Sequence, residues 1–168
     1  MVGQKLDVVV LLDTDKAGRD ASDALIKKWL TRYGSARAEV LHLGDAVGST
    51  EAEFSIEDFF PEDYYLKYVH QVYRKQLDSV DVKELSLRPG AQLCKRVDAA
   101  LGEFGIKFNK GSVSKLIRAH LSRAKEIGET PSETAEMAKK LMASISAAFA
   151  KMETIERRAA ETAEPIRD

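Results

Sequence analysis

The pattern of apolar and polar residues changes near residue 61 of this 168-residue chain. Before that point, two short runs are rich in valine and leucine, and each predicts a β-strand: Leu6–Leu12 and Arg37–Leu43. The first run has the continuous apolar character of a central strand of a parallel sheet, buried on both faces. Between the runs, Ala21, Leu25 and Trp29 recur at four-residue spacing, which indicates a helix. Together these elements predict an α/β fold with a parallel sheet.

From Glu62 onward the apolar residues recur with the period of a helix, and no further strand pattern follows. The apolar stripes that predict helices are Tyr65, Val69, Val72 and Tyr73; Cys94, Val97, Leu101 and Phe104; Val113, Leu116, Ile117 and Leu121; and Ala138, Leu141, Ile145, Phe149, Met152 and Ile155. We expect Ser112 to cap the third helix, and Thr130, followed by Pro131, to cap the fourth. The expected organisation is an α/β core over 1–61, a helical extension packed on it over 62–128, and a long C-terminal helix with a frayed tail over 129–168.

Composition narrows the possible classes of protein. The chain has 26 basic and 27 acidic residues and a net charge of −1, so any contact with a polyanion must be local. The single Cys94 excludes an intramolecular disulfide and a multi-cysteine zinc site. No stretch approaches the ~20 apolar residues of a transmembrane helix, and the N-terminus lacks a secretory-signal pattern. We therefore expect a cytoplasmic protein without a membrane partner.

Two acidic residues, Asp13 and Asp15, directly follow the first predicted strand. Ligands of open α/β sheets collect at the carboxyl ends of the strands, and two carboxylates in this spacing can reach the same hard cation. The pattern therefore predicts a divalent-metal site. The alternative is that the acids only cap the next helix, as acids at strand ends often do.

The segment LDVVVLLDTDKAGRD resembles the second signature of the TOPRIM domain, in which a hydrophobic strand ends in Asp-x-Asp and a glycine follows three residues after the second acid. The matching residues are Asp13, Asp15 and Gly18. The resemblance implies a partial TOPRIM, Rossmann-like parallel sheet of few strands ahead of the helical half. Haloacid dehalogenase phosphatases also carry Asp-x-Asp after a first strand, and in that weaker alternative Asp13 is the nucleophile. In the phosphatase pattern small and β-branched residues follow and lead to a nucleophile-type loop, whereas here Lys16, Ala17, Gly18 and Arg19 follow.

A second acidic segment reads EAEFSIEDFFPEDYY, and within it Ile56–Pro61 is similar to the "IEDLFP" segment of the overcoming-lysogenisation-defect (OLD) family. Members of that family are ATP-dependent nucleases with a C-terminal TOPRIM domain. The resemblance implies that acids of this segment complete the metal site, with Glu57 as the first choice and Glu53 or Asp58 as the next. The alternative is a solvated acidic loop with its carboxylates near the N-terminus of the next helix.

The stretch GIKFNKGSVSKLIRAHLSRA resembles the family's segment in which a lysine, just before a short apolar helix, points at the metal centre. Lys110 is the best match and Lys115 the fallback. Such a lysine can stabilise the charge that develops on a scissile phosphate, although an ordinary solvated lysine is the alternative. Carboxylates without imidazole or thiolate suit Mg²⁺ or Mn²⁺, and two ions about 4 Å apart can activate water and stabilise the leaving oxygen.

The resemblance implies the C-terminal TOPRIM portion of a metal-dependent DNA endonuclease, with DNA as its partner and an ATPase domain that supplies ATP hydrolysis. A complete TOPRIM domain begins with a strand and a glutamate-bearing turn, whereas this chain starts about five residues before the Asp-x-Asp strand. Neither that glutamate nor the ATPase phosphate loop, Gly-x-x-x-x-Gly-Lys-Ser/Thr, is present in the sequence. We therefore expect a fragment or a natural half of a nuclease, incomplete as an isolated chain. A different hypothesis is a non-catalytic TOPRIM-like assembly module whose last helix mediates homo-oligomerisation.

Overall fold

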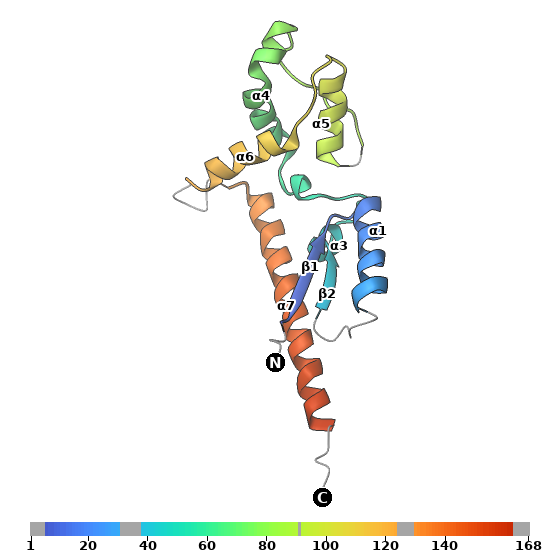
Figure 1. Cartoon of the computed structure of the whole chain (residues 1–168). Helices are drawn as coiled ribbons and strands as arrows, with labels where there is room; N and C mark the ends of the chain where they lie inside the picture. The colour runs from blue at the N-terminus through green and yellow to red at the C-terminus, as the bar shows by residue number, and fades with distance from the viewer. Residues whose placement is uncertain (1–5, 31–37, 91, 124–129, 163–168) are drawn as a thin grey trace, which may run out of the picture. The chain divides into compact units, whose positions relative to one another are not determined.

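The chain is a mixed α/β protein that is mostly helical, with a two-stranded parallel sheet (Figure 1). The computed structural model describes residues 6–30, 38–90, 92–123 and 130–162. Contacts group the chain into two compact units, which we name the sheet unit (1–50 and 139–168) and the helical unit (51–138). This grouping differs from the expected segments 1–61, 62–128 and 129–168, because the last helix contributes to both units.

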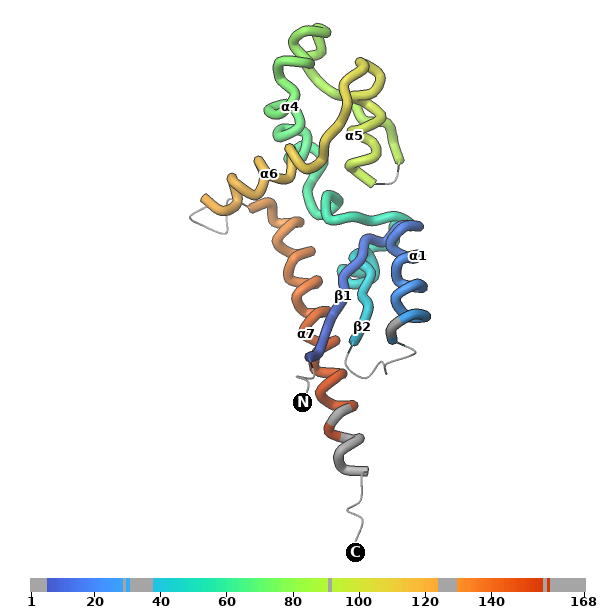
Figure 2. The backbone as a smooth tube through the Cα atoms, viewed as in Figure 1, coloured from blue at the N-terminus to red at the C-terminus, as the bar shows by residue number. Residues whose placement is uncertain are grey.

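The sheet unit contains the predicted strand, helix and strand in the predicted order. Strand β1 (Val8–Leu12) pairs in parallel with β2 (Ala38–His42), in a register that places Val10 opposite Val40. Figure 2 shows the two strands side by side along the backbone trace. The other elements are α1 (Lys16–Leu25), the π-helical turn η1 (Ile26–Leu30) and α3 (Leu43–Val47). The parallel sheet is therefore confirmed, while Arg37, where the second strand was expected to begin, lies outside the described residues.

The prediction that the first strand is buried on both faces is wrong. Val8 is 44% exposed and Leu11 is 37% exposed, because the described sheet has only two strands and β1 has a single neighbour. The expected inner face of α1 also differs. Gly18 and Ser22 are the buried residues of that helix, whereas Ala21 is exposed. Small side chains on the buried face let α1 approach β1 closely.

Helix α7 (Ser132–Thr162) is the long C-terminal helix that the sequence predicts. In the sheet unit its inner face includes Ala148 and Met152, which are buried, and the Ser144 hydroxyl donates a 2.7 Å hydrogen bond to the Ala46 carbonyl. Phe149, which was expected on this face, is 41% exposed because Ala148 occupies the inward position. No helix in the described part of the chain is long and apolar enough to cross a membrane.

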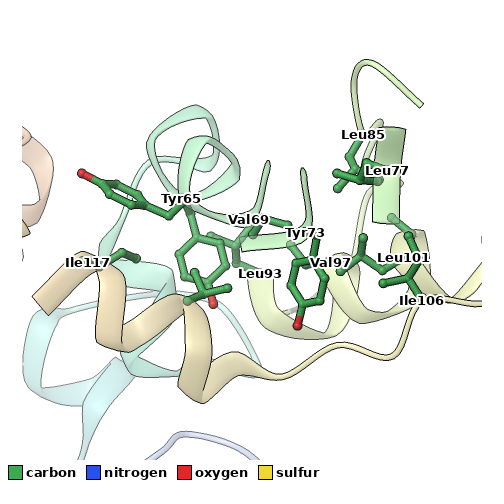
Figure 3. Packing of buried hydrophobic residues seen from close by; sticks show 13 residues of the cluster. Tyr65, Val69, Tyr73, Leu77, Leu85, Leu93, Val97, Leu101, Ile106 and Ile117 are labelled. Atoms are coloured by element: carbon green, nitrogen blue, oxygen red, sulfur yellow. The ribbon is translucent and has the colours of Figure 1, made fainter. Parts of the chain in front are cut away.

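The helical unit has the larger apolar core (Figure 3). Its elements are the 3₁₀ turn η3 (Ile56–Phe59), α4 (Glu62–Ser79), α5 (Leu93–Gly102) and α6 (Lys110–Leu121). The expected stripes supply much of the core, whose most deeply buried members are Tyr65, Val69, Val97, Leu101 and Val113. The 3.6-residue spacing therefore predicted these three helices and most of their inner faces. Phe104, which was expected on the stripe of α5, lies beyond the end of that helix and is 40% exposed.

The N-terminus of α6 differs from the prediction. Asn109, not Ser112, is the N-cap residue, and its side-chain oxygen accepts a 3.2 Å hydrogen bond from the Ser112 backbone N–H. Asparagine is among the best N-cap residues, and it stands three positions earlier in the chain. As a result, Lys110 lies in the first turn of α6. Helix α7 begins at Ser132, one residue after Pro131, which was expected to be its first residue.

Candidate functional site

The turn after β1, which we name the acidic turn (Asp13 to Gly18), is held by short-range contacts. Asp15 is the N-cap residue of α1, and its Oδ1 accepts a 2.8 Å hydrogen bond from the Gly18 N–H. A Cβ atom at Gly18 would lie 2.0 Å from the Asp13 carbonyl oxygen, so the turn requires glycine. The spacing Asp13, Asp15, Gly18 therefore has a physical cause. It does not by itself distinguish a helix cap from a metal ligand.

The acidic turn is also connected to the end of β2. Thr14 is 4% exposed, and its hydroxyl oxygen accepts a 2.7 Å hydrogen bond from the Gly44 N–H. His42, the last residue of β2, places its Nδ1 3.4 Å from the Asp13 carbonyl oxygen. Neither Thr14 nor His42 was predicted from the sequence as part of this site. The signal that could have revealed them is that parallel strands bring their carboxyl ends to one edge, where residues that follow each strand meet.

Asp58 and Glu53 of the second acidic segment both accept hydrogen bonds within the helical unit. Asp58 forms a capping box with Ser55, accepting hydrogen bonds of 2.7 Å from its N–H and 2.8 Å from its hydroxyl. The other oxygen of Asp58 accepts a 2.7 Å hydrogen bond from the Leu93 N–H at the start of α5. Glu53 pairs with Lys95 at 2.8 Å. Asp58 therefore joins η3 to α5, and Glu53 binds an exposed lysine.

Glu57 differs from its neighbours because its carboxylate is buried. The residue is 3% exposed, and its Oε1 lies 3.6 Å from the Nζ of Lys110. Its Oε2 is buried without a hydrogen-bond partner among the described residues. The structure thus brings together two of the sequence-predicted residues, the first-choice acid and the first-choice lysine. Lys115, the fallback lysine, is exposed on α6.

Glu57 lines a pocket of about 500 Å³ within the helical unit. Its other lining residues are Ile56, Phe60, Tyr65, Ser114, Ile117, Arg118, Leu121 and Ser122. The Tyr65 hydroxyl is the second buried polar atom without a hydrogen-bond partner in the described part of the chain. Burial, and then the charge of Glu57, raise the pKa of Tyr65 well above its ordinary value. The same two causes raise the pKa of the half-buried Cys94 thiol.

The expected metal ligands belong to different units. Asp13 and Asp15 lie in the sheet unit, whereas Glu53, Glu57, Asp58 and Lys110 lie in the helical unit. Among the described residues, no three histidine, cysteine, aspartate or glutamate side chains are grouped so that they could hold a metal ion. Asp13 and Asp15 offer the oxygen ligands that Mg²⁺ and Mn²⁺ prefer, but they are only two. The convergence of the two acidic segments therefore stays a prediction.

Comparison with known proteins identifies no family for this chain. No protein-family model, curated protein or solved structure matches the chain. The resemblance to OLD-type nucleases therefore depends on the motif residues alone.

Proposed function

We propose that this chain is the C-terminal TOPRIM portion of a divalent-metal-dependent DNA endonuclease of the OLD type. The observation that carries the proposal is the acidic turn, in which two carboxylates follow a parallel strand at the edge of the sheet where ligands bind. The close approach of Gly18 to the Asp13 carbonyl oxygen fixes the backbone between these acids. A turn with fixed geometry suits a magnesium-like ion, which tolerates little deviation from octahedral coordination.

In this proposal Asp13 and Asp15 hold Mg²⁺ or Mn²⁺, and Lys110 lies beside the phosphate of the DNA. Bound metal ions supply an activated water and stabilise the leaving oxygen in phosphodiester hydrolysis. Lys110 is suited to its role because it is 57% exposed at the side chain while its Nζ lies 3.6 Å from Glu57. The carboxylate attracts the ammonium group and so restricts its position. An ATPase domain on another part of the protein would supply ATP hydrolysis.

A metal-binding measurement tests the proposal without requiring activity from the chain alone. We expect Mn²⁺ titrated into the chain to bind, and Asp13→Asn to weaken the affinity about tenfold or more, because a charged ligand is lost. Asp23→Asn, on the exposed surface of α1, is the matched control and should bind like the unsubstituted chain. Equal Mn²⁺ affinities for all three proteins would contradict the proposal. Mn²⁺-dependent nicking of supercoiled plasmid that Asp13→Asn abolishes would extend it to catalysis.

The second candidate function, a non-catalytic assembly module, is favoured by apolar residues on the outer side of α7. Met142 is 60% exposed and Phe149 is 41% exposed, at a separation of two helical turns. Such a stripe is suited to packing against the same helix of a second copy. We expect sedimentation to show oligomers that dissociate in Met142→Glu with Phe149→Glu and persist in Ala147→Glu. A monomer at all concentrations would exclude this function.

A further inference from the structure

The sequence around helix α6 is basic. Residues 104–125 contain six lysine and arginine residues and no aspartate or glutamate, although the whole chain has a net charge of −1. Lys110, Lys115 and Arg118 belong to α6, and Arg123 follows its C-terminal end. All four residues are exposed. This part of the helical unit is therefore a local positive surface, as contact with a polyanion requires.

One side of α6 carries its cations among small side chains. At spacings of four, three and four residues it presents Gly111, Lys115, Arg118 and Ser122, and we name this side the basic face. The two uncharged members are small and exposed, so phosphate oxygens can approach the cations closely. Lys115, Arg118 and Arg123 form no ion pair with another residue that the structure describes. Their charges are therefore available to a ligand.

The pocket of about 500 Å³ lies at the edge of the basic face. Arg118 and Ser122 belong both to this face and to the lining of the pocket. The walls that solvent reaches are apolar, since Ile56 is 46% exposed and Phe60 and Leu121 are half-buried. The volume lies within the range of small-molecule sites in proteins. A flat ring can therefore enter the pocket from the side on which the cations lie.

Negative charge at the pocket is buried and paired with a cation. Glu57 is the only carboxylate among the described residues that line it, and it is 3% exposed. Its Oε1 lies 3.6 Å from the Lys110 Nζ. The exposed polar groups are the Arg118 guanidinium and the hydroxyls of Ser114 and Ser122. A complementary ligand therefore has a flat apolar group beside one or more anionic groups.

We propose that α6 binds a single nucleic-acid strand, with phosphates along Lys115, Arg118 and Arg123 and one unstacked base in the apolar pocket. Bases of a single strand are free to leave the stack, whereas bases of a duplex enter a pocket only if they are flipped out. Phe60 supplies an aromatic wall for the base, and its ring stacks on Tyr64 at 5.7 Å between centroids. The choice of a nucleic acid over an acidic peptide with an apolar anchor rests on the proposed nuclease function. The basic face and the pocket do not.

A single strand is then the substrate of the proposed nuclease. Lys110, which the proposed function places beside the phosphate of the DNA, is the first residue of the same helix. The 12 residues of α6 span ~18 Å, so a strand that follows the helix passes from Arg118 to Lys110. Binding should depend little on the identity of the base, because an apolar wall stacks on any base and hydroxyls both donate and accept.

Fluorescence anisotropy with the whole chain in EDTA tests the inference without metal. The probes are labelled strands of about ten nucleotides, longer than the ~18 Å of α6: oligo(dT), a strand with the same number of phosphates and no bases, and a duplex. We expect oligo(dT) to bind about tenfold more tightly than the other two, because only it offers both phosphates and an unpaired base. Equal affinities for oligo(dT) and the strand without bases, binding of the duplex as tight as that of oligo(dT), or no binding at all would overturn the inference.

The salt dependence of binding tests the basic face. Lys115→Gln with Arg118→Gln should reduce the slope of log affinity against log salt concentration by about 1.4, because two phosphate contacts are lost and each contributes about 0.7 in a single strand. Lys75→Gln with Lys83→Gln removes the same charge from exposed positions outside α6 and should leave the slope unchanged. The same reduction in both double variants would show that binding follows the net charge of the chain and not the basic face.

Obstruction of the pocket tests the site for the base. Ser114 is exposed and lines the pocket, so Ser114→Leu should remove the advantage of oligo(dT) over the strand without bases. Ile56→Asn makes an exposed wall polar and should also reduce this advantage, which protects the test if the first variant loses its native circular dichroism. Ala119→Leu, exposed on α6 but outside the pocket lining, is the matched control and should retain the advantage. An advantage that survives both pocket variants would exclude the pocket as the base site.

Competition and metal binding separate the other outcomes. If an acidic peptide of equal charge with one phenylalanine displaces oligo(dT) as well as unlabelled oligo(dT) does, the surface binds protein and the nucleic-acid assignment is wrong. If Mn²⁺ affinity falls in Asp13→Asn while oligo(dT) fails to bind, only the single-strand site is refuted. Binding of oligo(dT) without any Mn²⁺ binding refutes only the metal site.

Discussion

The sheet unit and the helical unit use acidic side chains in different ways. In the sheet unit, Asp15 accepts a hydrogen bond from an N–H three residues away. In the helical unit, Asp58 accepts one from Leu93, 35 residues away, and Glu53 binds Lys95, 42 residues away. The acidic turn is therefore a local structure, and the acids of the helical unit depend on the packing of separate elements. Backbone geometry thus fixes the carboxylate of Asp15, whereas contacts between η3, α5 and the preceding loop fix those of Asp58 and Glu53.

The two units also differ in burial. The helical unit contains residues of 0% exposure on α4, α5 and α6, whereas no residue of β1 is buried. A developed core can hold a carboxylate such as Glu57 away from solvent, and the two-stranded sheet leaves its acids near the surface. The two candidate regions therefore differ in environment, since Asp13 and Asp15 are only partly buried and Glu57 is 3% exposed. Four experiments test this contrast.

The largest expected effect comes from removing core volume in one unit and not in the other. Leu101→Ala should lower the free energy of unfolding by about 3 kcal/mol, because the side chain is 0% exposed in the helical core. Leu11→Ala, at a position that is 37% exposed on β1, should cost under about 1 kcal/mol. Urea unfolding followed by circular dichroism measures both changes. Equal losses would show that the two units do not differ in packing as described.

In the sheet unit, a substitution that disturbs the backbone of the acidic turn should lower the stability most. Gly18→Ala should lower the free energy of unfolding by about 2 kcal/mol, since the new methyl group meets the Asp13 carbonyl oxygen and the turn must open. The control is Gly102→Ala at the end of α5, where a Cβ meets no atom within 4 Å. That change should be neutral or stabilise by about 0.5 kcal/mol. If thermal unfolding shows a larger loss of stability for Gly102→Ala than for Gly18→Ala, the turn does not require glycine at position 18.

The acids themselves should differ in the cost of their removal. Asp58→Ala should cost about 2 kcal/mol, because it removes the capping box and the contact with Leu93. Asp15→Ala should cost about 1 kcal/mol, as expected for the loss of an N-cap side chain. Hydrogen exchange should show faster opening at the start of α5 in the first variant and at the start of α1 in the second. A larger loss of unfolding free energy for Asp15→Ala than for Asp58→Ala would contradict the expected difference between the two units.

The smallest expected effect is a pH dependence at the buried Tyr65 hydroxyl. Burial and the charge of Glu57 raise the pKa of Tyr65 above its ordinary value of 10.0, so the folded protein favours the protonated hydroxyl. The stabilisation is fully present below that value and is lost as the pH rises through the higher pKa of the folded state. Tyr65→Phe should therefore flatten the decline in the free energy of unfolding above pH 10, by under about 1 kcal/mol at pH ~10.5. Parallel curves for both proteins would contradict the burial of this hydroxyl.

The sequence predicted helices and strands correctly where the apolar residues of a segment followed a single periodicity. The stripes around Tyr65 and Leu101 identified α4 and α5, and two valine-rich runs identified the parallel strands. The predictions failed where two residues could each cap the same helix, and where burial depended on the number of neighbouring strands. Asn109 replaced Ser112 as the cap of α6, and the exposure of Leu11 followed from the single neighbour of β1.

For the candidate site, the sequence by itself determined the local shape of the acidic turn, because the Asp15 cap and the close approach of Gly18 to Asp13 lie within six residues. The contacts of Thr14 and Asp13 with the end of β2 were decided by the pairing of the strands. Only the tertiary structure decided among the loop acids. Glu53, Glu57 and Asp58 lie in one short segment of similar composition, and their different partners come from α5 and α6. Local spacing cannot specify which of several adjacent carboxylates turns inward. That choice is made when distant helices pack, since their side chains and backbone N–H groups determine which carboxylate oxygen atoms are paired.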